Sequence, residues 1–339
     1  METPMEEIVW RLRLTAPLVL SFLTLCLVSQ AVSQQNNITT FDAPGAANGT
    51  MGQDINEDGK IVGVYTDVNG SSHGFVRDPR GTITTFDVPG GSNTNATGIN
   101  EDGVIVGSFA DGTGVHGFLR RRGGYKTFDL PTGATFTFAH VNDGGTIAGS
   151  FYYFGSAQSF VRSPQGTFTT FGSSVYTFAY DLNNTGTIVG TSQADFSFAS
   201  SAFVRFPDGT VTSLQIPDTV GVSAHGINDG GAIVGSYTDT TIRVHGFVRD
   251  AQGTITPIDV PGASSTYALS INKVGEITGQ YFDGSGGSRG FVRSSHGTIT
   301  TFDAPGASFT FPMRISEEGD IVGWYWDTNF LAHGFLLRR

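Results

Sequence analysis

The sequence predicts an all-β fold, a seven-bladed β-propeller with four strands in each blade. One unit of roughly 43 residues occurs seven times, a period typical of propeller blades. Glycine accounts for 47 of the 339 residues and phenylalanine for 27, while lysine occurs only at Lys60, Lys126 and Lys273. Many glycines together with aromatic and β-branched residues favour short strands that are joined by tight turns.

Four markers recur in the same order in each unit, 41 to 45 residues apart. They are a Thr-rich segment that ends in Phe-Asp, a segment that ends in Ile-Asn, the tripeptide Ile-Val-Gly and the tripeptide His-Gly-Phe. The asparagine of the second marker is Asn56, Asn100, Asn142, Asn183, Asn228 and Asn272, and Ser316 replaces it in the last unit. Each marker predicts one strand, so that a unit supplies four, whereas solenoid repeats are shorter or helical.

The order of the strands within a blade follows from the turns. The pattern Asn-x-x-Gly, as in Asn100–Gly103, predicts a tight hairpin between the second and third markers. The strand after the first such hairpin, Lys60–Tyr65, is apolar on both faces, which indicates burial on both sides. We therefore expect the Ile-Asn strand innermost, then the Ile-Val-Gly strand, then the His-Gly-Phe strand, with the Phe-Asp strand outermost.

The two ends of the repeat region predict how the ring closes. The first marker begins at Ile38 and the last marker ends at Phe335, so the last unit supplies only three strands of its own. We expect Ile38–Asp42 to add the fourth strand to the last blade. Ring closure removes the exposed sheet edges that invite aggregation. We expect the chain to act as a monomer.

The N-terminal segment reads as a signal peptide over residues 1–33, followed by a single propeller domain over residues 34–339. Arg11 and Arg13 precede the apolar run Leu18–Val28, and Ala31–Ser33 offers the small residues of a cleavage site. The run is shorter than a membrane-spanning helix requires. The expected location is therefore secreted, extracellular or periplasmic, without a membrane span in the mature chain; an uncleaved N-terminal anchor is the alternative.

Charge and cysteine content exclude several classes of function. The net charge of −11 argues against a nucleic-acid partner, because phosphate binding needs clustered Lys and Arg. Cys26 is the only cysteine and lies in the apolar N-terminal run. The mature chain would therefore have no disulfide, no catalytic thiol and no cysteine-ligated metal.

The repeat resembles that of the bacterial extracellular HAF-repeat family over residues 38–339. The resemblance rests on His-x-Phe, an outer strand, and then Ala-x-x-Ile-Asn-x-x-Gly-x-Ile-Val-Gly. The chain departs from the family pattern with Gly at the centre of the tripeptide in five units, although Ser201-Ala202-Phe203 keeps Ala. It also has Thr-Thr-Phe-Asp where the family more often shows Asp-Leu-Gly. The resemblance implies export and a repeat-built β fold, and it assigns no activity and no functional residue.

Four histidines share one position of the repeat and invite a metal-binding interpretation; they are His73, His116, His245 and His333. Zinc ligands must lie within roughly 4 Å of one another. Sevenfold geometry separates equivalent side chains on the third strand by more than about 10 Å. We therefore predict that each histidine binds its own blade's backbone or a repeated aspartate, and that repeated arginines such as Arg77 pair with aspartates in the same way.

One hairpin has the spacing of a calcium loop. Residues 54–59 read Asp-x-Asn-x-Asp-Gly, with Asp54, Asn56 and Asp58 as the candidate ligands. The twelfth position would be Tyr65, so the bidentate glutamate of an EF-hand is missing. A solvated hairpin is the simpler interpretation, and this weak calcium motif is the only cofactor site that the sequence offers.

Residues that break the repeat are the candidates for a binding site, because residues common to all units are explained by blade construction. The candidates are Asp54, His140, Asp181 and Arg314, two positions before the Ile-Asn asparagine, with Phe138, Phe178, Tyr180 and Phe311 close by. We expect these eight residues to surround one end of the central channel. Aromatic faces beside a few charged groups suit a sugar or a peptide, whereas packing between blades is the alternative role for many of them.

Three functions remain open on the sequence alone. The first is a secreted, non-catalytic binding or scaffold module that recognises an extracellular glycan or peptide at the channel mouth. The second is an exported polysaccharide lyase or hydrolase that uses His140, Asp181, Tyr180 and Arg314 near the axis. The third is a purely structural role in a surface layer. The sequence contains no Ser-His-Asp order and no phosphate-binding or cofactor motif.

Overall fold

The computed structural model describes residues 32–33, 37–131, 134–153, 155–172, 176–194 and 199–339. This part of the chain consists of β-strands that pair almost entirely antiparallel. Within the same ranges there is no helix, and hence none that is long and apolar enough to cross a membrane. The predicted signal peptide lies outside the described residues except for β1 (Val32–Ser33), which pairs in parallel with β26.

Each repeat of the sequence forms four antiparallel strands, which we call a unit. Unit 1 consists of β3 (Thr50–Ile55), β4 (Ile61–Thr66), β5 (Ser72–Arg77) and β6 (Ile83–Phe86). Unit 2 consists of β7 (Ser92–Ile99), β8 (Ile105–Asp111), β9 (Gly114–Arg121) and β10 (Gly124–Asp129). Unit 3 consists of β11 (Thr135–Val141), β12 (Ile147–Tyr153), β13 (Ser156–Arg162) and β14 (Phe168–Phe171).

The remaining units follow the same order. Unit 4 consists of β15 (Tyr176–Leu182), β16 (Ile188–Gln193), β17 (Ser200–Arg205) and β18 (Val211–Leu214). Unit 5 consists of β19 (Thr219–Ile227), β20 (Ile233–Asp239), β21 (Val244–Arg249) and β22 (Ile255–Ile258). Unit 6 consists of β23 (Ser265–Ile271), β24 (Ile277–Phe282), β25 (Ser288–Arg293) and β26 (Ile299–Phe302). Unit 7 consists of β27 (Phe309–Ile315), β28 (Ile321–Trp326), β29 (Ala332–Leu337) and β2 (Ile38–Phe41).

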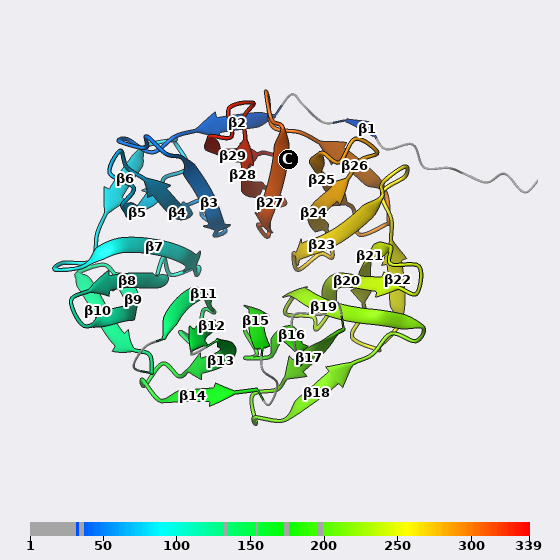
Figure 1. The fold of residues 1–339 in the computed structure, drawn as a ribbon, viewed down its shortest axis with the longest axis horizontal. Helices are drawn as coiled ribbons and strands as arrows, with labels where there is room; N and C mark the ends of the chain where they lie inside the picture. The colour runs from blue at the N-terminus through cyan, green and yellow to red at the C-terminus, as the bar shows by residue number, and fades with distance from the viewer. Residues whose placement is uncertain (1–31, 34–36, 132–133, 154, 173–175, 195–198) are drawn as a thin grey trace, which may run out of the picture.

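The units lie around a common centre, with the Ile-Asn strand of each unit nearest that centre (Figure 1). The strand order predicted from the turns is confirmed by the pairing of the strands. The N-terminal strand β2 pairs with β29, and Phe41 lies opposite Gly334. Next to this pairing, Phe41 and Leu336 pack in one apolar cluster with Ile61 and Phe75 of unit 1. The first and last parts of the chain therefore share both a sheet and a core cluster.

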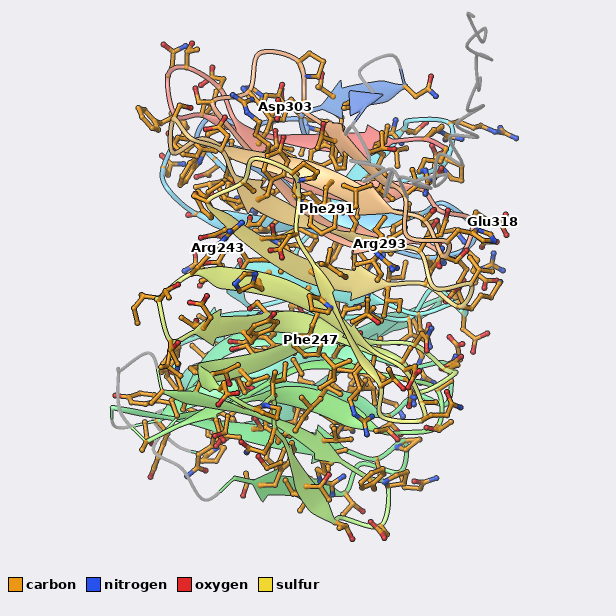
Figure 2. All side chains as sticks on the ribbon, turned by 90° about the vertical axis from the view of Figure 1, so that its right-hand side faces the viewer. Arg243, Phe247, Phe291, Arg293, Asp303 and Glu318 are labelled. Carbon is orange, nitrogen blue, oxygen red and sulfur yellow. The ribbon has the colours of Figure 1, made fainter. Side chains whose placement is uncertain are left out.

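Two ends of the molecule can be distinguished by the turns that they carry. At the lower end, the innermost strand of each unit finishes in the Asn-x-x-Gly hairpin, or in unit 7 the equivalent hairpin Ser316–Gly319, which contains Glu318. At the upper end, the second strand turns into the third, which in unit 5 places Arg243. In Figure 2 the upper end, with Arg243, lies on the left and the lower end, with Glu318, lies on the right.

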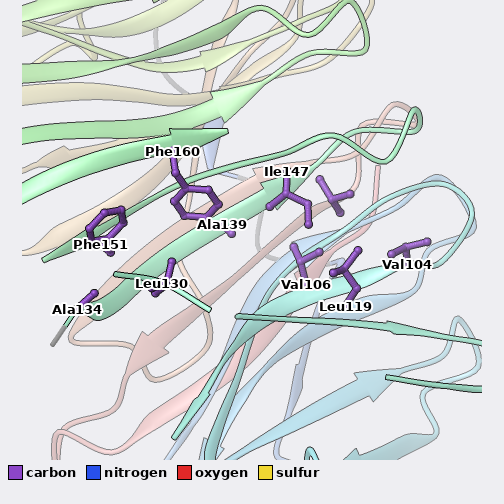
Figure 3. Packing of buried hydrophobic residues seen from close by; sticks show 10 residues of the cluster. Val104, Val106, Leu119, Leu130, Ala134, Ala139, Ile147, Phe151 and Phe160 are labelled. Carbon is purple, nitrogen blue, oxygen red and sulfur yellow. The ribbon is translucent and has the colours of Figure 1, made fainter. Parts of the chain in front are cut away.

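The hydrophobic core lies within and between units. The phenylalanines of the fourth marker are almost completely buried; they are Phe75, Phe118, Phe160, Phe203, Phe247, Phe291 and Phe335. Figure 2 shows Phe247 and Phe291 inside the stacked strands, and Figure 3 shows Val106 and Leu119 of unit 2 beside Ile147 of unit 3. The third marker requires glycine because a Cβ on Gly63 would collide with the carbonyl oxygen of Met51 and the ring of Phe75.

The repeated asparagines form a belt of hydrogen bonds around the lower end. The Oδ1 of Asn142 accepts the backbone N–H of Thr146 (2.9 Å), which closes its own hairpin. Its Nδ2 donates to the backbone carbonyl of Asn183 in the next unit (3.1 Å). The same inter-unit bond leads from Asn56, Asn100, Asn183, Asn228 and Asn272 to the unit that follows each of them. One buried side chain thus fixes both a turn and the neighbouring unit, which explains the second marker.

The repeated histidines bind aspartates of their own unit, as predicted. The Nδ1 of His73 lies 3.0 Å from Asp87, its Nε2 lies 3.6 Å from Asp67, and its ring stacks on Tyr65. Equivalent contacts exist at His116, His245 and His333. Partial burial opposes protonation, but the hydrogen bonds and charges of Asp87 and Asp67 raise the pKa of His73.

The prediction for the repeated arginines was wrong. In units 1 to 4 their guanidinium groups lie over the outer-strand phenylalanine of the preceding unit instead of pairing with aspartates. Arg77 covers Phe41 at 5.2 Å, Arg120 covers Phe86 at 4.5 Å, and Arg162 and Arg205 make the same contact. A planar guanidinium stacks well on an aromatic face, so these arginines cover the joints between units.

Candidate functional site

A β-bulge in each innermost strand directs side chains toward the channel. In six units the pairing register shifts at the third residue before the Ile-Asn asparagine. In unit 3 the shift lies earlier, between Phe136 and Phe138. The bulged residue has no partner in the neighbouring strand, so its side chain is free to leave the sheet. These residues are Gln53, Thr97, Tyr180, His225, Leu269 and Met313.

The bulged residues line a cavity of about 230 Å³, the upper cavity. Phe138 and His140 of unit 3 and Arg314 of unit 7 complete its walls. Four of the predicted site residues, Phe138, His140, Tyr180 and Arg314, are therefore brought together. The volume suits a single ring or one large side chain.

Arg314 forms the floor of the upper cavity and reaches across the axis. Its Nη2 donates to Oδ1 of Asp181 in unit 4 (2.9 Å), and its Nε lies 3.3 Å from Oδ1 of Asp54 in unit 1. Burial opposes the charge, but the carboxylates of Asp181 and Asp54 raise the pKa of Arg314. The same side chain lines a second, lower cavity of about 110 Å³. Arg314 thus separates the two ends of the channel.

The two aspartates also fasten adjacent units. The backbone N–H of Ile99 in unit 2 donates to Oδ2 of Asp54 (2.9 Å), and the N–H of Ile227 in unit 5 donates to Oδ2 of Asp181 (2.9 Å). Their side chains are only 5% and 3% exposed, which leaves little carboxylate surface for a ligand. They therefore hold Arg314 and the backbone of the next unit.

Aromatic rings gather in two groups, one on units 3 and 4 and one on unit 7. On one side, Tyr180 stacks between Phe138 (5.5 Å between ring centroids) and Phe178 (6.1 Å), and Tyr152 meets the edge of Phe178. On the other side, Phe311 stacks on Trp324 at 4.2 Å. Units 3 and 4 lie on the opposite side of the common centre from unit 7 (Figure 1). Phe138 and Tyr180 line the cavity itself, and Phe311 lies two residues before the lining residue Met313 on β27.

Burial keeps the polar side chains of the upper cavity uncharged, apart from Arg314. Burial lowers the pKa of His225 to about 4, and its Nε2 lies 3.2 Å from the hydroxyl of Ser236. Burial and the charge of Arg314 lower the pKa of His140. The Nδ1 of His140 has no hydrogen-bond partner among the residues that the structure describes. Burial also raises the pKa of Tyr180 to about 12.

The lower cavity is surrounded by acidic residues that follow the asparagine belt. The N–H of Glu57 donates to Oε2 of Glu101 (2.8 Å), and the N–H of Glu101 donates to Oδ1 of Asp143 (3.0 Å). Lys273 donates to Glu57 across the opening (3.3 Å). Burial and the neighbouring carboxylates raise the pKa of Glu101 to about 7. These carboxylates accept bonds from adjacent units and so continue the construction of the lower end.

The residues of the calcium-like loop have separate partners. Asp54 binds Arg314 and the backbone of Ile99, Asn56 belongs to the belt, and Asp58 pairs with Lys60 (2.6 Å). In the described part of the chain, no group of three or more His, Cys, Asp or Glu side chains has the geometry of a metal site.

Sequence reasoning missed five residues of the upper cavity: Gln53, Thr97, His225, Leu269 and Met313. If side chains alternated strictly along the strand, these five would not point toward the channel. The bulge interrupts the alternation and turns them toward it. The signal that was available is their variability, because this position carries a different residue in each of these five units.

The chain was compared with known proteins. No protein-family model matches it, and no curated protein matches its sequence. A streptogramin B lyase structure aligns with a TM-score of 0.57 at 17% identity, over 88% of this chain and 96% of the other. A catalytically inactive virginiamycin B lyase from Staphylococcus aureus with quinupristin gives 0.59 at 14%, over 89% and 99%. YCF48 bound to the D1 peptide gives 0.56 at 11%, over 91% and 99%. At these identities the likeness concerns the fold alone, and that fold is a β-propeller.

Proposed function

We propose that this chain is a secreted binding module of the HAF-repeat type, whose seven units close into a ring and whose upper cavity recognises an extracellular glycan or peptide. The pairing of β2 with β29 and the apolar cluster shared by units 7 and 1 support closure. The N-terminal Arg11, Arg13 and Leu18–Val28 support export. N-terminal sequencing of the exported protein tests this part, and the expected mature start is residue 34.

The observation that carries the proposal is the concentration of unrepeated side chains in one cavity. Phe138 and Tyr180 offer aromatic surface, and Gln53, His140 and His225 offer neutral hydrogen-bonding groups. Concave sites with an apolar lining and a few directed polar groups are typical of ligand binding. The structural neighbour YCF48 is bound to a peptide, so the same fold serves binding elsewhere.

The protonation states of the same residues favour binding over catalysis. A general base acts best when its pKa lies near the working pH. The pKa of His225 is lowered to about 4 and that of Tyr180 is raised to about 12, both by burial. Arg314 is already neutralised by two carboxylates, so it is a poor anchor for an anionic substrate. The lyase or hydrolase alternative would need these groups in other states.

The test is a glycan and peptide array probed with the exported protein. We expect binding that falls about fivefold in Tyr180→Ala and in Phe311→Ala, since stacking of aromatic rings contributes on the order of 1 kcal/mol. Tyr180→Phe, which keeps the ring, checks that any loss does not come from misfolding. Phe206→Ala removes an exposed ring from a lower turn and serves as the matched control. The absence of any ligand, or equal binding by all variants, would refute the proposal.

A further inference from the structure

Unit 7 carries a continuous aromatic surface that leads outward from the upper cavity. Phe311 stacks on Trp324 (4.2 Å between centroids), and Trp326 meets the edges of Phe311 (5.4 Å) and of Phe309 (5.9 Å). Phe330 continues the row at 6.3 Å from Trp326. From Met313 at the cavity to Phe309 the strand rises by four residues, roughly 13 Å. The surface is therefore longer than one sugar ring.

Phe330 occupies a turn position that is glycine in units 1 and 6 (Gly70 and Gly286) and isoleucine in unit 5 (Ile242). It has a φ of +61° and is 70% exposed. Its N–H donates to the carbonyl of Asp327 (3.1 Å), and Gly70 and Gly286 make the same bond in units 1 and 6 with a φ of +82°. A bulky residue is strained in this conformation, and strain of this kind persists at functional positions. The turn itself does not require Phe330, and its ring gains little burial.

The polar groups around the cavity indicate what kind of ligand fits. Neutral His140 and His225 and the amide of Gln53 each combine a hydrogen-bond donor with an acceptor, whereas the hydroxyl of Thr97 already bonds to the backbone N–H and carbonyl of Ala139. A hydroxyl group of a ligand is likewise both donor and acceptor, so it can pair with His140, His225 or Gln53. Asp54, Asp181 and Arg314 together carry one net negative charge, and the chain carries −11. Anionic ligands are disfavoured on both counts.

We propose that the ligand is a neutral oligosaccharide of more than one ring, and that Phe330 with Trp326 forms an outer subsite for it on unit 7. This inference rests on the proposed function. One sugar ring enters the upper cavity, and the following rings stack along Phe311, Trp324 and Trp326 to Phe330. Sugars with equatorial hydroxyl groups suit such a surface because their C–H groups face the aromatic rings.

The experiment compares Phe330→Gly with Ile242→Gly. Ile242 has a φ of +66° and is 61% exposed in the equivalent turn of unit 5, away from the aromatic surface. Both variants relieve the same backbone strain, so we expect each to melt a few degrees higher than the unmodified protein. We expect only Phe330→Gly to bind the best neutral oligosaccharide from the array about fivefold more weakly by calorimetry. Stability and binding then change in opposite directions in one variant.

The outcomes separate the two proposals. Unchanged affinity in Phe330→Gly, with loss of affinity in Tyr180→Ala, overturns the outer subsite and leaves the upper cavity as the site. Binding of peptides or of uronate oligosaccharides alone overturns the neutral-glycan assignment but not the binding function. An array on which nothing binds overturns both. Equal losses in Ile242→Gly and Phe330→Gly also overturn the subsite, because they place the effect in the turns generally.

Discussion

The upper and lower ends of the channel are built from the same strands but follow different rules. At the lower end, the same asparagine in successive units makes the same two hydrogen bonds. At the upper end, the position three residues earlier carries a different side chain in nearly every unit and lines a cavity. Arg314 divides the two ends. Repetition serves the ring at one end, while departures from repetition gather at the other, where a ligand can reach them.

The largest expected effect concerns Arg314, the residue that divides the two ends of the channel (the divider). Arg314→Met leaves Asp54 and Asp181 buried without their cation, so we expect the free energy of unfolding to fall by about 3–5 kcal/mol at neutral pH. Denaturant unfolding measures this change. Lys60→Met breaks the exposed pair with Asp58 and should leave the free energy of unfolding nearly unchanged. A loss below 1 kcal/mol in Arg314→Met would show that the divider does not stabilise the channel.

The asparagine belt gives the second largest expected effect. Asn142→Ala leaves the N–H of Thr146 and the carbonyl of Asn183 without a partner, and we expect a loss of about 2–3 kcal/mol in unfolding free energy. Asn184 follows the belt residue Asn183 in unit 4 and is exposed. Asn184→Ala should therefore cost less than about 1 kcal/mol in unfolding free energy. Equal losses in the two variants would remove the special role of the buried belt.

The histidines at the upper end give a smaller effect that depends on pH. Because the aspartates raise the pKa of His73 and His116, their stabilisation is complete below about pH 6.5 and is lost as pH rises through the folded pKa. As pH rises from about 5 to about 8, we expect the stability of the double variant His73→Gln, His116→Gln to fall less than that of the unmodified protein. Thermal melts across that range measure the difference. Gln158 occupies this position in unit 3, so the substitution has a precedent in the chain.

Glu101 at the lower end gives the smallest expected effect, which also depends on pH. The folded chain holds the proton of Glu101 up to about pH 7, whereas the unfolded chain releases it near 4.5, so stability falls as pH rises between these values. Glu101→Gln keeps the hydrogen bond from Glu57 and removes the charge. We expect it to melt slightly higher than the unmodified protein at about pH 8 and equally at about pH 4. A lower melting temperature at pH 8 would contradict this assignment.

Much of the fold follows from the sequence because each repeated residue has one local task. The strand order and the His–Asp contacts were predictable from spacing alone. The role of Arg77 was not, because its partner Phe41 belongs to the neighbouring unit, and a contact between units leaves no spacing signal within one unit. Prediction placed Asp54 and Asp181 in a ligand site, but the structure turns them toward Arg314 and the backbone. The bulge that exposes His225 is equally invisible to alternation.

In the asparagine belt, each side-chain amide donates to the unit that follows it, and this series ends at unit 7. Ser316 in unit 7 has no side-chain amide that could donate to the backbone of Asn56 in unit 1. The junction between the last unit and the first therefore depends on other contacts. Arg314 reaches Asp54 there, Arg338 donates to the carbonyl of Pro79, and Lys273 reaches Glu57 from unit 6. Several of these are charged and lie at the surface, where salt weakens them. We therefore expect opening under force, heat or high salt to begin between unit 7 and unit 1, and hydrogen exchange to be fastest there.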